Sequence, residues 1–183
     1  AVQAVEFDYM KPTWVFLDPK VEADFAVIGK DIPAFLDLVS RDRDDKKWIV
    51  AIRRSEAPAG YFFFDRTTKK RHRLFEEKPA LTKFYRAQKK PVVIKARDGL
   101  ELVSYLTTPL GLPLKNLPLV LLIHGGPWFR DNFDFDPEVQ LLANRGYAVL
   151  QVNYRGSTGF GLKFLNAGTN EWGRGTQEDL FDA

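Results

Sequence analysis

The stretch LLIHGGPWFRDN, residues 121–132, ends an apolar segment with a histidine, two glycines and a proline. It continues LPLVLLIH (117–124), an uninterrupted apolar run of strand length, which is typical of a strand buried on both faces. Consecutive glycines let a backbone turn sharply and approach a ligand closely. The His-Gly-Gly segment is therefore either an ordinary turn or a loop whose backbone N–H groups bind a ligand.

A hairpin and a helix flank this segment in the sequence. KKPVVIKARDGLELVSYLTTP (89–109) predicts two strands joined by an Asp-Gly pair, which strongly favours a hairpin turn. On the other side, DPEVQLLANRG (136–146) predicts a helix, because Asp136 supplies an N-cap and Gly146 a stop signal.

Two further segments extend the pattern. YAVLQVNY (147–154) predicts the next buried strand, and QEDLFDA (177–183) predicts the start of another helix. Strands that alternate with helices favour an α/β fold with a parallel sheet covered by helices. Ligands bind to such sheets outside the C-terminal ends of the strands, which is where His124 lies.

The first half of the chain has a different sequence pattern, which is typical of antiparallel β-structure. KKWIVAIRRS (46–55) is rich in β-branched and aromatic residues, and so is the segment 60–76. We expect a three-stranded meander, with Tyr61–Phe64 and Arg71–Phe75 as its second and third strands. A helix is expected to precede it, starting after Asp18.

Charge is distributed unevenly along the 183 residues. Residues 1–90 hold 19 Lys and Arg against 14 Asp and Glu, whereas residues 91–183 hold 8 against 10. The basic excess peaks in RTTKKRHR (66–73), between two expected strands. An anionic-surface patch and a hairpin edge protected by basic side chains are both compatible with this run, and its position favours the hairpin edge.

Composition excludes several kinds of function. The chain has no cysteine, so disulfides, cysteine-ligated metals and thiol nucleophiles are excluded within it. No apolar run approaches the roughly 18 residues of a membrane-spanning helix, and AVQAVEFDYM (1–10) lacks the pattern of a signal peptide. We therefore expect no membrane partner and a cytoplasmic location.

The position of the His-Gly-Gly segment favours the ligand-binding alternative over the ordinary turn. It follows the third strand expected in the second half, where α/β-hydrolases carry an oxyanion-binding loop of similar sequence. Backbone N–H groups at such a turn can stabilise the oxyanion of a tetrahedral intermediate.

A family resemblance extends over most of the chain. LLIHGGPWFRDNFDFDPEVQLLANRGYAVLQVNYRGSTGFG (121–161) resembles the start of the catalytic domain of the prolyl oligopeptidase family of serine peptidases. HGGP, ANRGYAV and NYRGSTGFG occur in that family in this order and spacing, most closely in its acylaminoacyl-peptidase and dipeptidyl-peptidase-like branch. RDGLELVSYLTTP (97–109) resembles the leading hairpin of that domain, and the segment 42–70 is similar to the closing blades of the family's β-propeller.

The resemblance implies a fold and a function. Residues 1–85 are expected to be C-terminal blades of a β-propeller, and residues 86–183 the N-terminal part of an α/β-hydrolase catalytic domain. The implied activity is hydrolysis of short peptides by a serine-type peptidase through an acyl-enzyme, with the propeller restricting access to the site. The implied substrate is a short peptide, and a homo-oligomer is left open.

The resemblance also assigns candidate site residues. The backbone N–H of Gly125 or Gly126 is implied as one oxyanion donor. His124, Trp128 and Arg130 are candidates for contact with substrate, although a structural histidine and loop-stabilising side chains are equal alternatives.

A serine peptidase also needs a nucleophile, a base and an orienting carboxylate. The chain has four serines, and none lies in G-x-S-x-G; the nearest match is Ser157 in RGSTG. We reject Ser157 because no helix is expected directly after it, because it comes one strand–helix unit early, and because both histidines, His72 and His124, precede it. The chain is expected to be an internal fragment that lacks the catalytic triad and is inactive alone.

Two other functions remain as alternatives: part of a different α/β-hydrolase, such as an esterase, or a non-catalytic β-rich scaffold that keeps a hydrolase remnant. DNFDFDPE (131–138) has calcium-like spacing at Asp134 and Asp136, but it lacks the other EF-hand ligands, so a helix-capping loop is favoured. We expect no metal, no cofactor and no nucleic-acid partner.

Overall fold

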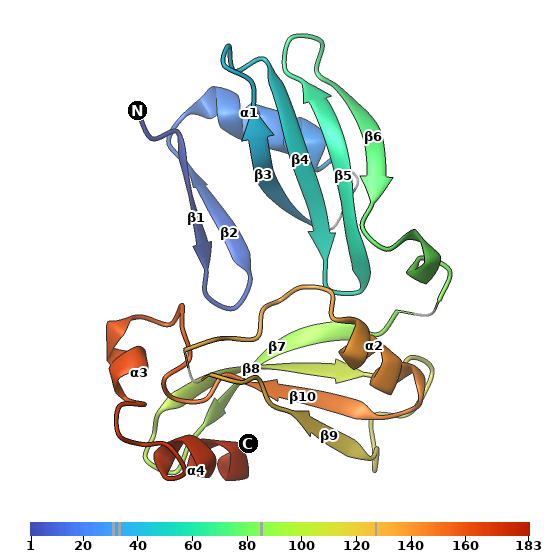
Figure 1. Cartoon of the computed structure of the whole chain (residues 1–183). Coiled ribbons are helices and arrows are strands. Elements are labelled where there is room, and N and C mark those ends of the chain that lie inside the picture. The colour runs from blue at the N-terminus through green and yellow to red at the C-terminus, as the bar shows by residue number, and fades with distance from the viewer. Residues whose placement is uncertain (31, 33, 85, 127) are drawn as a thin grey trace. The chain divides into compact units, whose positions relative to one another are not determined.

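The computed structural model describes residues 1–30, 32, 34–84, 86–126 and 128–183 (Figure 1). They form two compact units. Unit 1 comprises Ala1–Phe7 and Pro12–Phe84, and unit 2 comprises Asp8–Lys11 and Tyr85–Ala183. The short segment Asp8–Lys11, between two strands of unit 1, thus belongs to unit 2.

Unit 1 is built on a four-stranded antiparallel sheet in the order β3-β4-β5-β6. Its strands are β3 (Phe35–Arg41), β4 (Lys47–Arg54), β5 (Ala57–Asp65) and β6 (Lys70–Glu76). The meander expected from the sequence is present, but it has a fourth strand, β3, that the sequence analysis did not identify. Only Leu36 in β3 is fully buried, so its sequence carries a weak strand signal.

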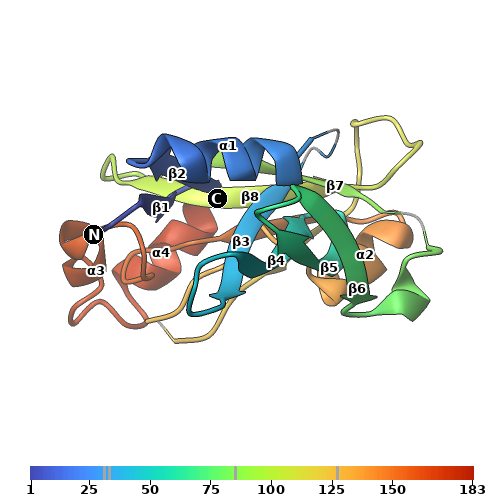
Figure 2. The ribbon, with the colours of Figure 1, turned by 90° about the horizontal axis from the view of Figure 1, so that it is seen from above.

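A hairpin and a helix complete unit 1. The hairpin of β1 (Ala4–Asp8) and β2 (Pro12–Phe16) was not expected from the sequence. Helix α1 (Pro19–Ile28) was expected; Asp18 caps it by accepting a hydrogen bond from Lys20 N at 2.9 Å. The helix runs along one face of the sheet (Figures 1 and 2), and its buried side chains pack into one core with those of the strands: Val21, Phe25, Ile28, Leu36, Trp48, Val50, Ile52 and Phe64.

The basic run 66–73 forms the β5–β6 turn and the edge strand β6, as the hairpin interpretation predicted. Part of its charge is neutralised inside unit 1. Arg66 Nε lies 2.8 Å from the buried carboxylate of Asp24, which also pairs with Lys69. Arg71 donates a hydrogen bond to the Ile28 carbonyl at the end of α1. These contacts favour a structural role for the run.

Unit 2 is built on a second four-stranded sheet, in the order β7-β8-β10-β9. Its strands are β7 (Gln88–Lys95), β8 (Glu101–Thr108), β9 (Leu119–Leu122) and β10 (Ala148–Val152). The expected hairpin forms the antiparallel pair β7–β8, and β10 pairs antiparallel with β8 and parallel with β9. In the described part of this sheet the parallel arrangement is therefore confined to β9 and β10, because the leading hairpin supplies the other two strands.

Helices cover both faces of this sheet. Helix α2 (Pro137–Asn144) connects β9 to β10 and begins at Asp136, whose carboxylate accepts hydrogen bonds from Glu138 N and Val139 N. This is the capping role that the sequence predicted for Asp136. On the other face, Leu150 and Val152 share a core with residues of α3 (Leu162–Asn166) and α4 (Gly175–Asp182). Among the described residues, none of the helices is long and apolar enough to cross a membrane.

A buried ion pair ties α4 to the end of β10. The carboxylate of Asp179 is fully buried and accepts hydrogen bonds from Arg155 N at 2.8 Å, Nε at 2.9 Å and Nη2 at 2.6 Å. Asp98, in the β7–β8 turn, accepts a further bond from Arg155 Nη2 at 2.8 Å. These hydrogen bonds raise the pKa of Arg155 above its ordinary value. One guanidinium thus joins a helix, a strand end and a hairpin.

We expect Asp179→Asn to lower the free energy of unfolding by about 3 kcal/mol, because it removes the buried carboxylate and leaves Arg155 paired only with the half-exposed Asp98. The matched control is Asp182→Asn, whose partner Arg97 has 56% of its side chain exposed. Urea unfolding followed by circular dichroism measures both variants. Equal losses would show that the Arg155 pair does not tie α4 to the sheet.

Candidate active site

The His-Gly-Gly turn lies at the C-terminal end of β9, beside the end of β10. Parallel pairing places Leu122 opposite Gln151, so the residues that follow both strands meet at one edge of the sheet. His124 and Tyr154 stack there with ring centroids 4.6 Å apart and an interplanar angle of 14°. Strand ends of this kind are the usual ligand-binding edge of an α/β sheet.

His124 is buried, and both of its ring nitrogens have partners. Nε2 lies 3.0 Å from Ser157 Oγ, and Nδ1 lies 2.8 Å from the carbonyl oxygen of Gly125. The Tyr154 hydroxyl donates a hydrogen bond to the carbonyl oxygen of His124 at 3.0 Å and also approaches the Gly125 carbonyl, at 3.5 Å. The histidine therefore holds the backbone of its own turn.

This contact fixes the direction of one backbone donor. In a trans peptide, the C=O and the following N–H point in opposite directions. Because the Gly125 carbonyl points toward His124, the N–H of Gly126 points away from the histidine. Among the described residues, the N–H groups of Gly125 and Gly126 donate to no other backbone oxygen. Gly126 also lines a hollow of about 260 Å³, together with Ile123, Tyr154 and Trp172.

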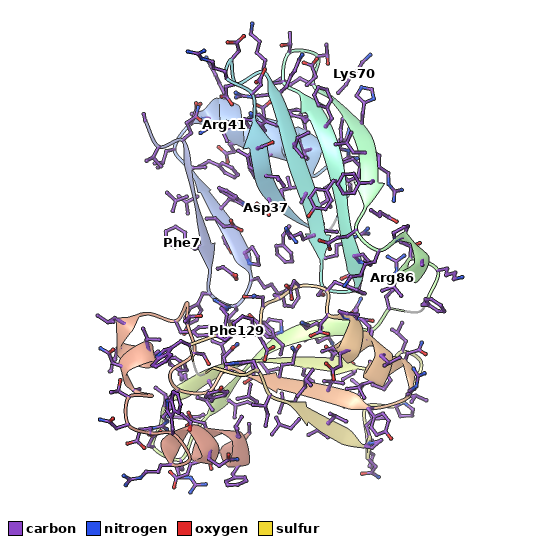
Figure 3. All side chains as sticks on the ribbon, in the orientation of Figure 1. Phe7, Asp37, Arg41, Lys70, Arg86 and Phe129 are labelled. Atoms are coloured by element: carbon purple, nitrogen blue, oxygen red, sulfur yellow. The ribbon has the colours of Figure 1, made fainter. Side chains whose placement is uncertain are left out.

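Two aromatic side chains after the turn are exposed. Trp128 has 67% of its surface exposed and contacts Trp172 edge to face, with ring centroids 5.7 Å apart. Phe129, labelled in Figure 3, is 60% exposed. Both side chains are therefore accessible next to the turn. Pro127, the last residue of the HGGP motif, lies outside the described residues.

Arg130 is engaged in contacts that stabilise the loop. Its guanidinium donates to the carbonyl oxygens of Asp8 at 2.7 Å and Tyr9 at 2.9 Å, both within unit 2. It also packs over the Phe160 ring, 4.4 Å from the centroid. These partners favour the loop-stabilising alternative for Arg130.

Polar side chains in β10 and directly after it hold Asp131, the residue that follows Arg130. Asn153 is fully buried; its Oδ1 accepts from Asp131 N at 2.8 Å, and its Nδ2 donates to Asp131 O at 3.3 Å and to Val103 O at 3.0 Å. Gln151 Nε2 donates to Asp131 Oδ1 at 2.8 Å. Sequence reasoning missed Asn153, Gln151 and Tyr154 as parts of the site. The signal that could have identified them is the presence of polar residues within and directly after an otherwise apolar strand.

Ser157 contacts a histidine, which its position in the sequence did not suggest. The hydroxyl is fully buried and donates to the Tyr154 carbonyl at 2.6 Å. The other nitrogen of His124 faces a backbone carbonyl, whereas a catalytic base is oriented by a carboxylate. The nearest following helix, α3, begins only at Leu162. Burial and geometry both support the rejection of Ser157 as a nucleophile.

The structure thus brings His124, Gly125, Gly126, Trp128 and Arg130 together around one turn. Oxyanion binding by the two glycines, and substrate contact by His124, Trp128 and Arg130, stay predictions. The arrangement can present a backbone N–H to an anionic oxygen at a strand end. Among the described residues of unit 2, both serines, Ser104 and Ser157, are buried.

Comparison with known proteins relates the chain to peptidases. Residues 133–183 match the sequence profile of the prolyl oligopeptidase family. Dipeptidyl aminopeptidase BIII of Pseudoxanthomonas mexicana is 44% identical over 189 residues, which cover 100% of this chain and 27% of that protein. Dipeptidyl peptidase family member 6 of Caenorhabditis elegans is 34% identical over 169 residues, covering 81% of this chain and 23% of that protein.

A solved structure shares the fold. Acylaminoacyl peptidase of Pyrococcus horikoshii superposes with a TM-score of 0.63 at 24% identity, covering 79% of this chain and 23% of that one. The chain therefore spans about a quarter of the length of the curated relatives it matches, 27% and 23%.

We expect Gly126→Ala to cost about 1–3 kcal/mol of stability, because a side chain there must adopt a strained backbone. Gly126 has φ +127°, and an added Cβ would lie 2.7 Å from Trp128 N. Gly125→Ala is the matched control: a Cβ there meets nothing within 4 Å, so we expect a change within about 0.5 kcal/mol. Thermal unfolding of both variants is the measurement. Equal effects would contradict the assigned turn geometry.

Proposed function

Because the chain belongs to the prolyl oligopeptidase family, we propose that it contributes the oxyanion-binding part of a serine-type peptidase that hydrolyses short peptides. The observation that carries this proposal is the Gly125 carbonyl held by His124 Nδ1, which directs the Gly126 N–H away from the histidine. The HGG turn at a strand end is the sequence feature that resembles the oxyanion loop of this family.

The turn would act when a serine attacks the substrate carbonyl. Attack converts that carbonyl into a tetrahedral centre with a negatively charged oxygen. Collapse of this centre breaks the peptide C–N bond, releases the amine half of the substrate with a proton from the general acid, and leaves an acyl-enzyme that water hydrolyses. A fixed N–H donor stabilises the charge without reorganising during the reaction. We assign this donor to Gly126, since its N–H direction is set by the Gly125 peptide plane.

His124, Tyr154 and Ser157 serve as positioning residues in this proposal. His124 is too enclosed to meet a substrate, with only 8% of its surface exposed. Its ring is held on one side by stacking on Tyr154 and at Nε2 by Ser157. A ring fixed in this way fixes the Gly125 carbonyl, and through it the oxyanion donor.

The two units correspond to two parts of the proposed enzyme. We assign unit 1 to the closing part of a β-propeller, supported by its four-stranded antiparallel meander. We assign unit 2 to the first part of an α/β-hydrolase domain, supported by the β9–α2–β10 crossover. The named dipeptidyl peptidases among the relatives favour a peptidase over the esterase alternative.

The nucleophile, base and orienting carboxylate are proposed to come from outside these 183 residues. We expect the chain alone not to react with a fluorophosphonate, which labels activated serines, because Ser157 is fully buried. The full gene product should be labelled at a serine elsewhere, and a short peptide substrate should slow that labelling. Mass spectrometry of the labelled peptide identifies the site, with Ser157→Ala as the control. Labelling of Ser157 itself would refute the proposal.

In the full gene product we expect His124→Ala to lower kcat about 10²-fold, the typical loss when a catalytic group is displaced by about 1 Å. KM should change little, because the histidine does not reach substrate. His72→Ala is the matched control, since His72 is the other histidine of these 183 residues and lies on strand β6 of unit 1, where it is exposed. A rise in KM with unchanged kcat would instead place His124 in substrate binding.

A further inference from the structure

Two buried oxygen atoms near the turn lack a hydrogen-bond partner among the described residues: Asp131 Oδ2 and Gln151 Oε1. They belong to side chains that are already joined, because Gln151 Nε2 donates to Asp131 Oδ1 at 2.8 Å. Each remaining atom is the second oxygen of its carboxyl or amide group. A buried acceptor left unsatisfied costs about 1–3 kcal/mol, and this pair has two.

One proton satisfies both atoms. An ionised carboxylate only accepts hydrogen bonds, so it cannot bond to an amide oxygen. A protonated carboxyl group carries an O–H donor, which can complete a ring with the amide: N–H to one oxygen and O–H to the other. We propose that Asp131 is held as a neutral carboxylic acid, doubly hydrogen-bonded to Gln151, over a pH range in which surface aspartates are ionised.

Burial, more than the surrounding charges, favours this state. Burial is the largest influence on Asp131 and raises its pKa, and Asp136 adds to the rise; His124, Lys89 and the hydrogen bond from Gln151 oppose it. Tyr105 and Tyr154 are the other titratable groups that face it.

Lys89, a buried cation that acts on Asp131, has partners of its own. Its ammonium donates to the Asn132 carbonyl at 3.1 Å, lies 4.0 Å from Asp134 Oδ1 and sits 5.6 Å from the centre of the Tyr105 ring. The structure records no hydrogen bond between Lys89 and Asp131 Oδ2, which is without a partner among the described residues. The proton therefore remains the group that best satisfies this oxygen.

The acid–amide pair fastens the loop that follows the oxyanion turn. Asn153 holds the backbone of Asp131, and Gln151 holds its side chain, so the residue is attached to β10 and its end at three points. Ionisation of Asp131 would leave Asp131 Oδ2 and Gln151 Oε1 as two acceptors with no hydrogen between them. Their repulsion would loosen the loop. The pairing stands on the fold alone, while its effect on the oxyanion donor Gly126 rests on the proposed function.

The first test is the titration of the Asp131 carboxyl carbon by nuclear magnetic resonance, assigned through the backbone of the full chain. We expect a midpoint above about 3.9, the value of an unperturbed aspartate. Asp134, in the same loop with 52% of its side chain exposed, is the internal comparison and should titrate lower than Asp131. A midpoint for Asp131 at or below about 3.9 would overturn the proposal.

The second test compares stability with Asp131→Asn between pH 4 and pH 8. The asparagine amide can donate to Gln151 Oε1 in place of the acid, so the variant should keep the ring at every pH. A raised pKa in the folded state means that the folded chain binds the proton more tightly, so wild-type stability should fall as pH rises through that pKa. We expect the stability of the variant relative to wild type to increase with pH; parallel curves would overturn the proposal.

The nuclear magnetic resonance signal of the Gly126 amide tests whether the Asp131–Gln151 pair affects the oxyanion donor. We expect this signal to shift with the Asp131 titration in wild type and to stay constant in Asp131→Asn. A Gly126 signal that ignores the titration would overturn the positioning role. Neither measurement depends on peptidase activity, so an inactive full gene product would refute the proposed function and leave the acid–amide pair intact.

Discussion

Parallel pairing of β9 with β10 is the constraint on which the rest of the site depends. It sets Leu122 opposite Gln151, so the two strands end together and their following residues share one edge. His124 then stacks on Tyr154, and Ser157 meets the imidazole across 33 positions of sequence. A shift of one residue in this register would turn alternate side chains to the other face and separate all of these partners.

The described residues of the loop after the turn, 128–136, pair with no strand, and side chains hold this backbone instead. Asn153 bonds both backbone polar groups of Asp131, and Arg130 bonds the carbonyls of Asp8 and Tyr9. Buried polar side chains in β10 and at its end thus replace a sheet ladder. In the proposed function, these bonds help to hold the loop that follows the Gly126 N–H, because electrostatic stabilisation requires a preorganised donor.

Local signals in the sequence predicted most elements of unit 2, because each is set by neighbouring residues. Asp136 caps α2 as expected, and the Asp-Gly pair joins β7 to β8. Unit 1 was predicted less completely. The hairpin of β1 and β2 and the strand β3 are partly exposed, so their stability depends on packing against α1 and β4, which short-range patterns do not record.

By itself, the sequence determined that an apolar strand ends in a His-Gly-Gly turn and that the nearby Ser157 lies outside a G-x-S-x-G pattern. Its prediction that this strand is buried on both faces was wrong: β9 lies at the edge of the four-stranded sheet, and its side chains are half-buried or exposed. It left open whether Gly125 or Gly126 provides the donor and whether His124 is structural. Only the tertiary structure decided how the histidine is used, through the contact of its Nδ1 with the Gly125 carbonyl at 2.8 Å. The physical reason is that the direction of the Gly126 N–H depends on which donor holds the carbonyl oxygen of the same peptide plane. Here the residues that fix the histidine ring, Tyr154 and Ser157, follow a different strand, β10.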